Sequence, residues 1–297
     1  MGRILIKGAT LLSSPQATPT VGDILIDGAY IKEVGAVGDV PVDEIIDGRG
    51  FLATPGLING HSHVAMGFFR GWPDDLPLQT WLEEWIWPAE AKLTVEDVYW
   101  GSLLGIGEML LAGVTAFADM YILMEGVAQA VYDSGARANL SRGIVCAEPG
   151  EVGLRENIQL VEKWHGRGDG RISVSFAPHA IYTCPPPFLR EVVAEARRRD
   201  VGLHMHVSET AVEVEDCRRQ WGQSPVEVLA EEGFLDRRLL AAHCVHLSSR
   251  DLDLLAQGGC YVAHNPTSNL KLASGIAPVP EMAAREIPVL LGTDGPA

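Results

Sequence analysis

The chain has 297 residues, of which 47% are hydrophobic and 21% are charged, so it is long enough to form a large hydrophobic core. Its 39 acidic and 23 basic residues give a formal charge of −16, which disfavours binding to nucleic acid or to an anionic membrane surface. The five cysteines are scattered and form no C-x-x-C pair, which is typical of reduced thiols in a cytoplasmic protein.

The first 53 residues differ in texture from the rest of the chain. Short β-rich runs are separated by Gly and Asp, and they read ILIKGATLL, DILIDGAYIKEVG and EIIDGRGFLAT. No helix of useful length interrupts them. We therefore predict that residues 1–53 form a small β domain of hairpin strands, equivalent to half of a β-sandwich.

From residue 54 onward, strand, loop and helix alternate. The eight candidate strands are 51–59, 113–120, 138–145, 172–178, 201–207, 239–245, 260–264 and 288–293. Most are short apolar runs without strict alternation, as in parallel strands that are buried on both faces. This α/β pattern predicts a TIM-like (β/α)₈ barrel over residues 54–297. A doubly wound open sheet is the alternative, but no G-x-G-x-x-G follows a first strand.

The last predicted strand lies close to the end of the chain. No eighth helix follows it, and no later strands could complete the small β domain. We therefore expect a C-terminally truncated chain, with a barrel that lacks its last helix and an incomplete β-sandwich.

Histidines gather at the ends of the predicted strands, where barrel enzymes place their catalytic groups. His61 and His63 follow the first strand in PGLINGHSH. Residues i and i+2 of an extended segment point to the same side, so both imidazoles can bind one metal ion. The fifth strand reads LHMHVSET and offers both His204 and His206 at the same spacing. Spacing alone leaves either as a ligand.

Three more polar side chains stand at strand ends. Glu209 leaves the fifth strand, His243 ends the sixth in AAHCVH, and Asp294 ends the eighth in LLGTDG. A carboxylate after an apolar strand is costly to bury unless it is bound to something. A metal ion would provide that partner for Asp294.

In order and position these elements resemble the amidohydrolase superfamily, whose barrel carries H-x-H after strand one, His after strands five and six, and Asp after strand eight. The resemblance covers the entire chain. The runs PGLINGHSH, LHMHVSET, AAHCVH, HNPTSNLKLASGIAPV and GTDG look closest to the group of deaminases that act on 5′-methylthioadenosine and S-adenosylhomocysteine. Triazine-type chlorohydrolases and other aminohydrolases are near neighbours.

The resemblance implies a metal site of His61, His63, His206 and Asp294. It selects His206 over His204 because Glu209 stands three residues after the ligand. Three imidazoles and a carboxylate suit Zn²⁺, with Fe²⁺ as the alternative. The fourth strand, RISVSFAPHA, offers no Lys to bridge two ions, so we expect one divalent metal per subunit.

The resemblance also implies a hydrolytic deamination that releases ammonia and leaves an inosine-type product. Asp294 would take a proton from water, and Glu209 would protonate the ring nitrogen beside the attacked carbon. His243 would hydrogen-bond the developing oxyanion or hold the water. The expected activity is that of a hydrolase acting on C–N bonds in cyclic amidines.

Four further residues match substrate-binding positions of the family. Trp81 would line the pocket around the base, Glu90 would accept hydrogen bonds from the ribose hydroxyls, and His179 would lie near both. Arg142 would pair with the carboxylate of a homocysteine tail. Arg155 lies two positions from a second family Arg, which argues against a tight grip on that tail. The neighbouring tryptophans, Trp85 and Trp87, are interpreted as packing residues.

Two other functions compete with the deaminase. An s-triazine or other heterocycle aminohydrolase or chlorohydrolase would use the same metal, but it has no ribose or carboxylate for Glu90 and Arg142 to bind. An inactive metal-binding fragment is the alternative from a different class. We expect a small nucleoside as the partner, with neither nucleic acid nor membrane. Barrels of this type often form homo-oligomers, but the sequence locates no interface.

Overall fold

The computed structural model describes residues 2–72, 76–146 and 150–295. Contacts between Cα atoms divide the chain into two compact units, Met1–Leu57 and Ile58–Ala297. The sequence placed a domain boundary a few residues earlier, after residue 53. The final two residues of the predicted barrel domain lie outside the described part of the chain.

The first unit contains a five-stranded sheet. Its strands are β1 (Arg3–Leu11), β2 (Thr20–Asp27), β3 (Tyr30–Gly35), β4 (Glu44–Asp47) and β5 (Leu52–Ala53). β2 pairs antiparallel with both β1 and β3, and the β2–β3 turn contains Gly28 at φ +60°, the left-handed conformation that tight hairpins favour. The expected small β domain is therefore present. β4 and β5 instead run parallel to β1, so the unit is not built from hairpins alone.

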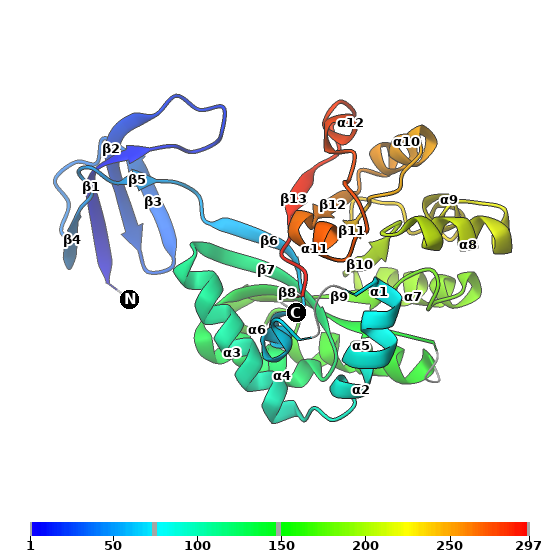
Figure 1. The fold of residues 1–297 in the computed structure, drawn as a ribbon. Helices are drawn as coiled ribbons and strands as arrows, with labels where there is room; N and C mark the ends of the chain where they lie inside the picture. The colour runs from blue at the N-terminus through cyan, green and yellow to red at the C-terminus, as the bar shows by residue number, and fades with distance from the viewer. Residues whose placement is uncertain (1, 73–75, 147–149, 296–297) are drawn as a thin grey trace. The chain divides into compact units, whose positions relative to one another are not determined.

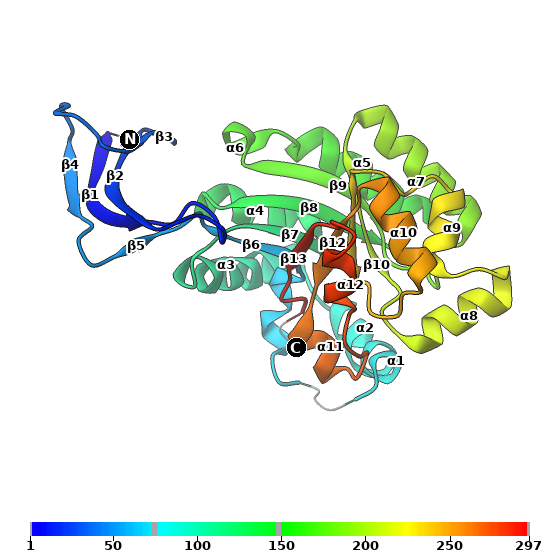
Figure 2. The ribbon, with the colours of Figure 1, turned by 90° about the horizontal axis from the view of Figure 1, so that it is seen from above.

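The second unit contains eight described parallel strands in the order in which they follow along the chain (Figures 1 and 2). They are β6 (Leu57–Ser62), β7 (Val114–Tyr121), β8 (Arg137–Ile144), β9 (Ile172–Pro178), β10 (Gly202–Val207), β11 (Leu239–His243), β12 (Tyr261–His264) and β13 (Val289–Leu291). A parallel bridge between Ser62 and Asp294 joins the last strand segment to the first. The predicted TIM-like barrel is thus confirmed.

The first barrel strand begins later than the sequence predicted. The sequence predicts one strand over residues 51–59, but β5 ends at Ala53 and β6 begins at Leu57. Pro55 lies between them, and proline has no N–H to donate to a sheet. The shift places His61 inside β6 and His63 immediately after Ser62, with both still on one side of an extended segment.

Most of the helices pack along the outer side of the strands (Figure 2). The longer ones are α3 (Val95–Leu111), α4 (Met124–Ser134), α5 (Gly150–Trp164), α7 (Pro186–Arg199), α8 (Ala211–Trp221), α9 (Pro225–Glu231) and α10 (Ser249–Gly258). The shorter ones are α6 (Arg167–Gly170), α11 (Pro266–Lys271) and α12 (Val279–Ala283). Thr94, Ser224 and Ser248 begin α3, α9 and α10 with capping boxes, which satisfy backbone N–H groups at the helix starts.

Short helical turns follow β6 and form part of the cavity wall described below. They are the 3₁₀ turn η1 (Val64–Phe69), α1 (Leu78–Thr80), the π-helical turn η2 (Trp81–Ile86) and α2 (Trp87–Glu90). Among the residues that the structure describes, no helix is both long and apolar enough to cross a membrane.

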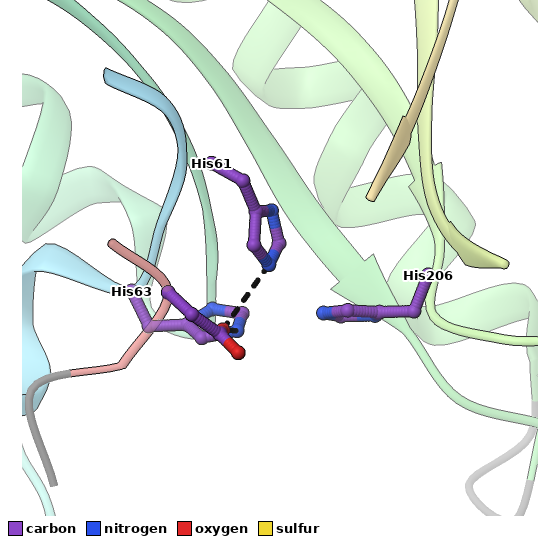
Figure 3. Close-up of side chains that lie close together, drawn as sticks. His61, His63 and His206 are labelled. Carbon is purple, nitrogen blue, oxygen red and sulfur yellow. Dashed lines mark ion pairs between the residues drawn. The ribbon is translucent and has the colours of Figure 1, made fainter. Parts of the chain in front are cut away.

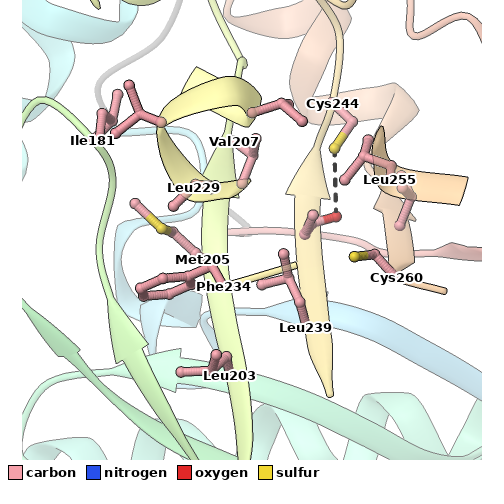
Figure 4. Close-up of a cluster of buried hydrophobic side chains, with 14 of the residues drawn as sticks. Ile181, Leu203, Met205, Val207, Leu229, Phe234, Leu239, Cys244, Leu255 and Cys260 are labelled. Atoms are coloured by element: carbon pink, nitrogen blue, oxygen red, sulfur yellow. Dashed lines mark hydrogen bonds between the residues drawn. The ribbon is translucent and has the colours of Figure 1, made fainter. Parts of the chain in front are cut away.

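Buried apolar side chains fix the strands that carry the candidate site. Met205 of β10 and Leu239 of β11 pack in one fully buried cluster with Phe234 and Leu229 (Figure 4). Burying a side chain of this size contributes about 1.5–3 kcal/mol to folding. The inward polar residues at the ends of β10 and β11 therefore rest on a rigid support.

Candidate active site

Four predicted ligands meet at the carboxyl ends of the barrel strands. His61, His63, His206 and Asp294 each offer one ligand atom, and these four atoms all lie within 4.8 Å of one another. The three imidazoles point toward a common centre (Figure 3). All four side chains are buried except His63, which is partly exposed.

Asp294 is held by the backbone as well as by its side chain. Its φ of +61° is the left-handed conformation, which non-glycine residues rarely adopt outside constrained sites. Its N–H donates to the carbonyl of His61 at 2.9 Å. Its Oδ1 lies 3.2 Å from Nε2 of His61 and 3.0 Å from Nε2 of His63. Although burial opposes ionisation, neighbouring imidazoles, His243 foremost, hold the pKa of Asp294 well below its ordinary value.

Backbone carbonyls fix the tautomers of two of the imidazoles. Nδ1 of His63 donates to the carbonyl of Met120, and Nδ1 of His206 donates to the carbonyl of His179 at 2.8 Å. A carbonyl oxygen only accepts, so a proton resides on each Nδ1. Nε2 of each ring therefore faces the centre as the atom available for a metal ion.

Charge at the centre depends on Asp294. Burial alone would lower the pKa of His63, but the carboxylate of Asp294 raises it to about 9. Burial lowers the pKa of His61 to about 4. At neutral pH the centre therefore favours a protonated, positively charged His63 paired with the negatively charged carboxylate of Asp294.

A buried acid and a buried imidazole stand beside the four predicted ligands. Oε1 of Glu209 accepts a 3.0 Å hydrogen bond from Ser274, and its Oε2 lies 3.7 Å from Nε2 of His243. The same Nε2 lies 3.6 Å from Oδ2 of Asp294, so His243 stands between two carboxylates. Nδ1 of His243 donates to Oδ1 of Asn269 at 2.8 Å.

These contacts shift the acid–base properties of both groups. Burial raises the pKa of Glu209, which favours its protonated form nearer to neutral pH. Burial opposes the ionisation of His243, but the carboxylates of Glu209 and Asp294 raise its pKa. Paired titratable groups with shifted pKa values are typical of sites that move protons.

Residues 52–297 match the model of the Amidohydrolase family, which covers most of the chain. The chain belongs to the amidohydrolase family. It is 50% identical over 300 residues to a "5-methylthioadenosine/S-adenosylhomocysteine deaminase" of Desulforudis audaxviator, with 99% of this chain and 70% of the relative covered. A protein of the same description from Carboxydothermus hydrogenoformans is 49% identical, with 99% of this chain and 69% of that protein covered.

Two solved structures share the fold. An adenosine deaminase from Xanthomonas campestris with bound zinc has a TM-score of 0.91 and 32% identity, over 98% of this chain and 69% of that one. A triazine hydrolase from Arthrobacter aurescens has a TM-score of 0.92 and 26% identity, over 99% of this chain and 72% of that one. This amidohydrolase is therefore a metal-dependent hydrolase that acts on C–N bonds.

The residues of this amidohydrolase fit a single divalent cation. Nε2 of His61 is buried and makes no hydrogen bond, although it lies beside Asp294. A buried nitrogen in that position lacks a partner that a cation would supply. Three imidazole nitrogens and one carboxylate are also a donor set that suits Zn²⁺ and other divalent transition metals.

A cavity of about 750 Å³ opens above the centre. The predicted ligands His63, His206 and Asp294 line it, as do Glu209 and His243. All the predicted substrate-contact residues line the same cavity, namely Trp81, Glu90, Arg142 and His179. The structure therefore brings the predicted site residues to the wall of one cavity, except His61, which is fully buried beside Asp294.

Trp87 also lines this cavity, whereas the sequence predicts a packing residue at this position. It lies at the start of α2, three residues before Glu90, and side chains at that spacing share one face of a helix. Trp85 is 38% exposed and contacts Trp72 edge to face.

The ionisable side chains predicted to contact the substrate differ in their surroundings. Nε of Arg142 donates to Oε2 of Glu156 at 2.7 Å. Burial raises the pKa of Glu90. Burial and the neighbouring imidazoles lower the pKa of His179 to about 3, so this ring is neutral. Arg155 is exposed on α5, and it is not among the side chains that line the cavity in the described residues.

Sequence reasoning missed the side chains that hold these groups in place. Ser268, Asn269 and Ser274 come from one segment, and they contact Asp294, His243 and Glu209 respectively. That segment, HNPTSNLKLASG, contributes to the family resemblance, but its spacing assigns no role to its polar side chains.

Proposed function

We propose that this amidohydrolase deaminates an adenosine-type nucleoside: 5′-methylthioadenosine, S-adenosylhomocysteine or adenosine. The products are ammonia and the inosine-type nucleoside. The observation that carries the proposal is the row of Glu209, His243 and Asp294 beside three converging imidazoles at the base of the cavity. The descriptions of the relatives from Desulforudis and Carboxydothermus support this class of substrate.

We propose one Zn²⁺ per subunit, held by His61, His63, His206 and Asp294, with Fe²⁺ as the alternative metal. When bound, such a cation supplies a Lewis acid that lowers the pKa of water toward neutrality. The zinc in the Xanthomonas campestris structure supports this choice of metal.

The chain's own residues would move the protons. Asp294 takes one proton from the attacking water, and Glu209 donates its proton to the ring nitrogen N1 as the water oxygen bonds to C6. His243, between the two carboxylates, hydrogen-bonds the oxygen added at C6. The proton on Asp294 then passes to the amino group, which leaves as ammonia. The remaining hydroxyl proton restores the acid form of Glu209.

The cavity wall would bind the rest of the nucleoside. Trp81 packs against the base or its substituent, and Glu90 accepts hydrogen bonds from the ribose hydroxyls. His179, a neutral ring, lies near the base and ribose. Arg142 is the candidate partner of a homocysteine carboxylate, but its Nε already donates to Glu156. We therefore propose that substrates without a charged tail are preferred.

Turnover of a substrate panel tests the proposal. Ammonia release and the loss of adenine absorbance are measured with 5′-methylthioadenosine, adenosine, S-adenosylhomocysteine and an s-triazine. We expect deamination of the nucleosides, with S-adenosylhomocysteine the poorest of the three. Activity on the triazine and none on any nucleoside would overturn the proposal.

The similarity to the Arthrobacter triazine hydrolase makes a heterocycle aminohydrolase or chlorohydrolase the second candidate. Glu90 distinguishes the two, because a triazine has no ribose. Glu90→Gln should raise KM for adenosine and leave triazine hydrolysis unchanged. If no substrate is turned over while metal is bound, the chain is an inactive metal-binding fragment.

We also propose that the enzyme acts in the cytoplasm on a small molecule, without nucleic-acid or membrane partners. The formal charge of −16 supports the exclusion of polyanionic partners.

A further inference from the structure

We infer that His204 is a positioning residue for His61: it accepts the Nδ1 proton of His61 and so leaves Nε2 of that ring free for the cation. Sequence spacing alone makes His204 and His206 equally good candidate ligands. The proposed metal site uses His206 and gives His204 no role. The inference rests on the proposed metal-dependent function, and it concerns a residue behind the ligands.

A chain of buried side chains runs from His61 into the barrel wall. Nδ1 of His61 lies 2.8 Å from Nε2 of His204, and the two rings meet edge to face at 84°. Nδ1 of His204 lies 3.3 Å from Oγ of Ser141 on β8. Ser141 in turn donates to the backbone carbonyl of Asp119 at 2.9 Å. His61, His204 and Ser141 have no exposed surface.

The position of each proton in this series of hydrogen bonds can be assigned by starting from the carbonyl of Asp119. The Asp119 carbonyl only accepts, so the Ser141 hydroxyl must donate to it. The Ser141 oxygen then accepts from Nδ1–H of His204. His204 is buried, and its two partners are an imidazole and a hydroxyl, neither of which carries negative charge, so its ring is neutral. Its Nε2 therefore holds a lone pair.

That lone pair decides the tautomer of His61. Nδ1–H of His61 donates to Nε2 of His204, and the neutral His61 ring keeps its own lone pair on Nε2, the atom beside Asp294. The opposite tautomer would direct an N–H at the centre and exclude a cation. It would also set two lone pairs against each other at 2.8 Å.

His61 differs in this respect from the other two imidazoles. His63 and His206 are fixed by backbone carbonyls, which no side-chain substitution removes. His61 depends on a side chain, so its tautomer can be changed by substitution. Substitution of a residue that hydrogen-bonds to a metal ligand typically lowers metal affinity by about 10- to 100-fold.

A matched pair of variants tests the inference. His204→Gln keeps an amide oxygen that can accept from His61 and an amide N–H that can donate to Ser141. His204→Leu has similar bulk and keeps neither. We measure zinc affinity by competition with a chelator, the melting temperature of the metal-free protein, and ¹⁵N shifts of labelled histidines, which report the nitrogen that carries the proton.

We expect His204→Leu to weaken zinc binding about 10- to 100-fold and His204→Gln to stay within a few-fold of the wild type. In the metal-free wild type, the ¹⁵N shifts of His61 should show the proton on Nδ1, and in His204→Leu they should show a mixture. Equal affinity losses in both variants would overturn the inference, because a packing role alone would give that result. Wild-type affinity in a folded His204→Leu protein would overturn it too.

Ser141→Ala provides a second route if His204→Leu does not fold. It frees Nδ1 of His204 from its acceptor, and we expect the ¹⁵N shifts of both His61 and His204 to change. Unchanged ¹⁵N shifts would contradict the proposed series of hydrogen bonds from His61 through His204 to Ser141. These measurements do not depend on turnover. If the wild-type protein binds zinc and carries the proton on Nδ1 of His61 but deaminates no substrate, the proposed function is wrong and the role of His204 stands.

Discussion

The hydroxyl of Ser268 donates a 2.6 Å hydrogen bond to Oδ2 of Asp294. Ser268 lies on α11 and is buried, so little water competes for this contact. The other oxygen of the carboxylate, Oδ1, faces Nε2 of His61 and His63. The two oxygens of Asp294 thus have separate surroundings, one toward the predicted ligands and one toward Ser268 and the cavity.

We expect Ser268→Ala to lower kcat about 10- to 100-fold while zinc content stays at one per subunit. A hydrogen bond to a charged group contributes about 1.5–3 kcal/mol, and 1.4 kcal/mol corresponds to a factor of ten in rate. Ser268→Thr, which keeps the hydroxyl, is the control and should retain most of the activity. Steady-state kinetics and metal analysis are the measurements. Loss of zinc from Ser268→Ala would show instead that Ser268 supports binding of the metal.

Glu209→Gln should keep the metal and lose most turnover. The amide preserves the shape of the side chain and the contact with Ser274, but it has no acidic proton to give to the ring nitrogen. A fall of about 100-fold or more in kcat is the expected size for a general acid. His206→Ala, at a predicted ligand, is the comparison and should lose zinc together with activity. If Glu209→Gln also lost its zinc, Glu209 would be a ligand.

The sequence was sufficient to locate the side chains at the strand ends. Parallel buried strands bring their carboxyl ends to one rim, so His61 and Asp294 are expected to meet there. Spacing leaves His204 and His206 as equal candidates at the fifth strand, and only the family resemblance selects His206. The fold class followed from the same periodicity of strands and helices.

The contacts behind those side chains could not be predicted in this way. Ser268 and Asp294 are brought together by a turn of α11 that no periodicity describes. His204 has two hydrogen-bond partners, Ser141 and His61, which come from different strands. A hydrogen bond between segments that are distant in the sequence cannot be detected from local residue spacing. The left-handed backbone at His243 and Asp294 also cannot be read from residue-type patterns.

Asp119 holds the segment that carries His63, and its removal should destabilise the protein. Its Oδ1 accepts hydrogen bonds from Oγ of Ser62 at 3.0 Å and from N–H of Val64 at 2.6 Å, the two neighbours of His63. Asp119→Ala would leave the buried Val64 N–H without an acceptor, which costs about 1–3 kcal/mol. Asp119→Asn keeps an acceptor oxygen and should lose less.

Urea unfolding of the metal-free variants and zinc affinity measure these effects. The expected order of stability is wild type, Asp119→Asn, then Asp119→Ala, and zinc affinity should follow the same order because His63 moves with the segment. If Asp119→Ala were as stable as the wild type, the two hydrogen bonds would not hold this segment.

Zinc binding should release at least one proton at pH 7.5. Although burial opposes it, the carboxylate of Asp294 raises the pKa of His63 to about 9, so the ring carries a second proton at neutral pH. A cation requires the Nε2 lone pair and must displace that proton. The pKa of His61 is lowered to about 4, chiefly by burial, so His61 holds no second proton to release. At pH 9.5, most of the His63 rings have already lost that proton, so the number released on binding should fall by roughly 0.7 between the two pH values. Titration calorimetry in two buffers that differ in ionisation enthalpy, at pH 7.5 and again at pH 9.5, measures this number. A heat of binding that does not depend on the buffer at pH 7.5 would contradict the pairing of His63 with Asp294.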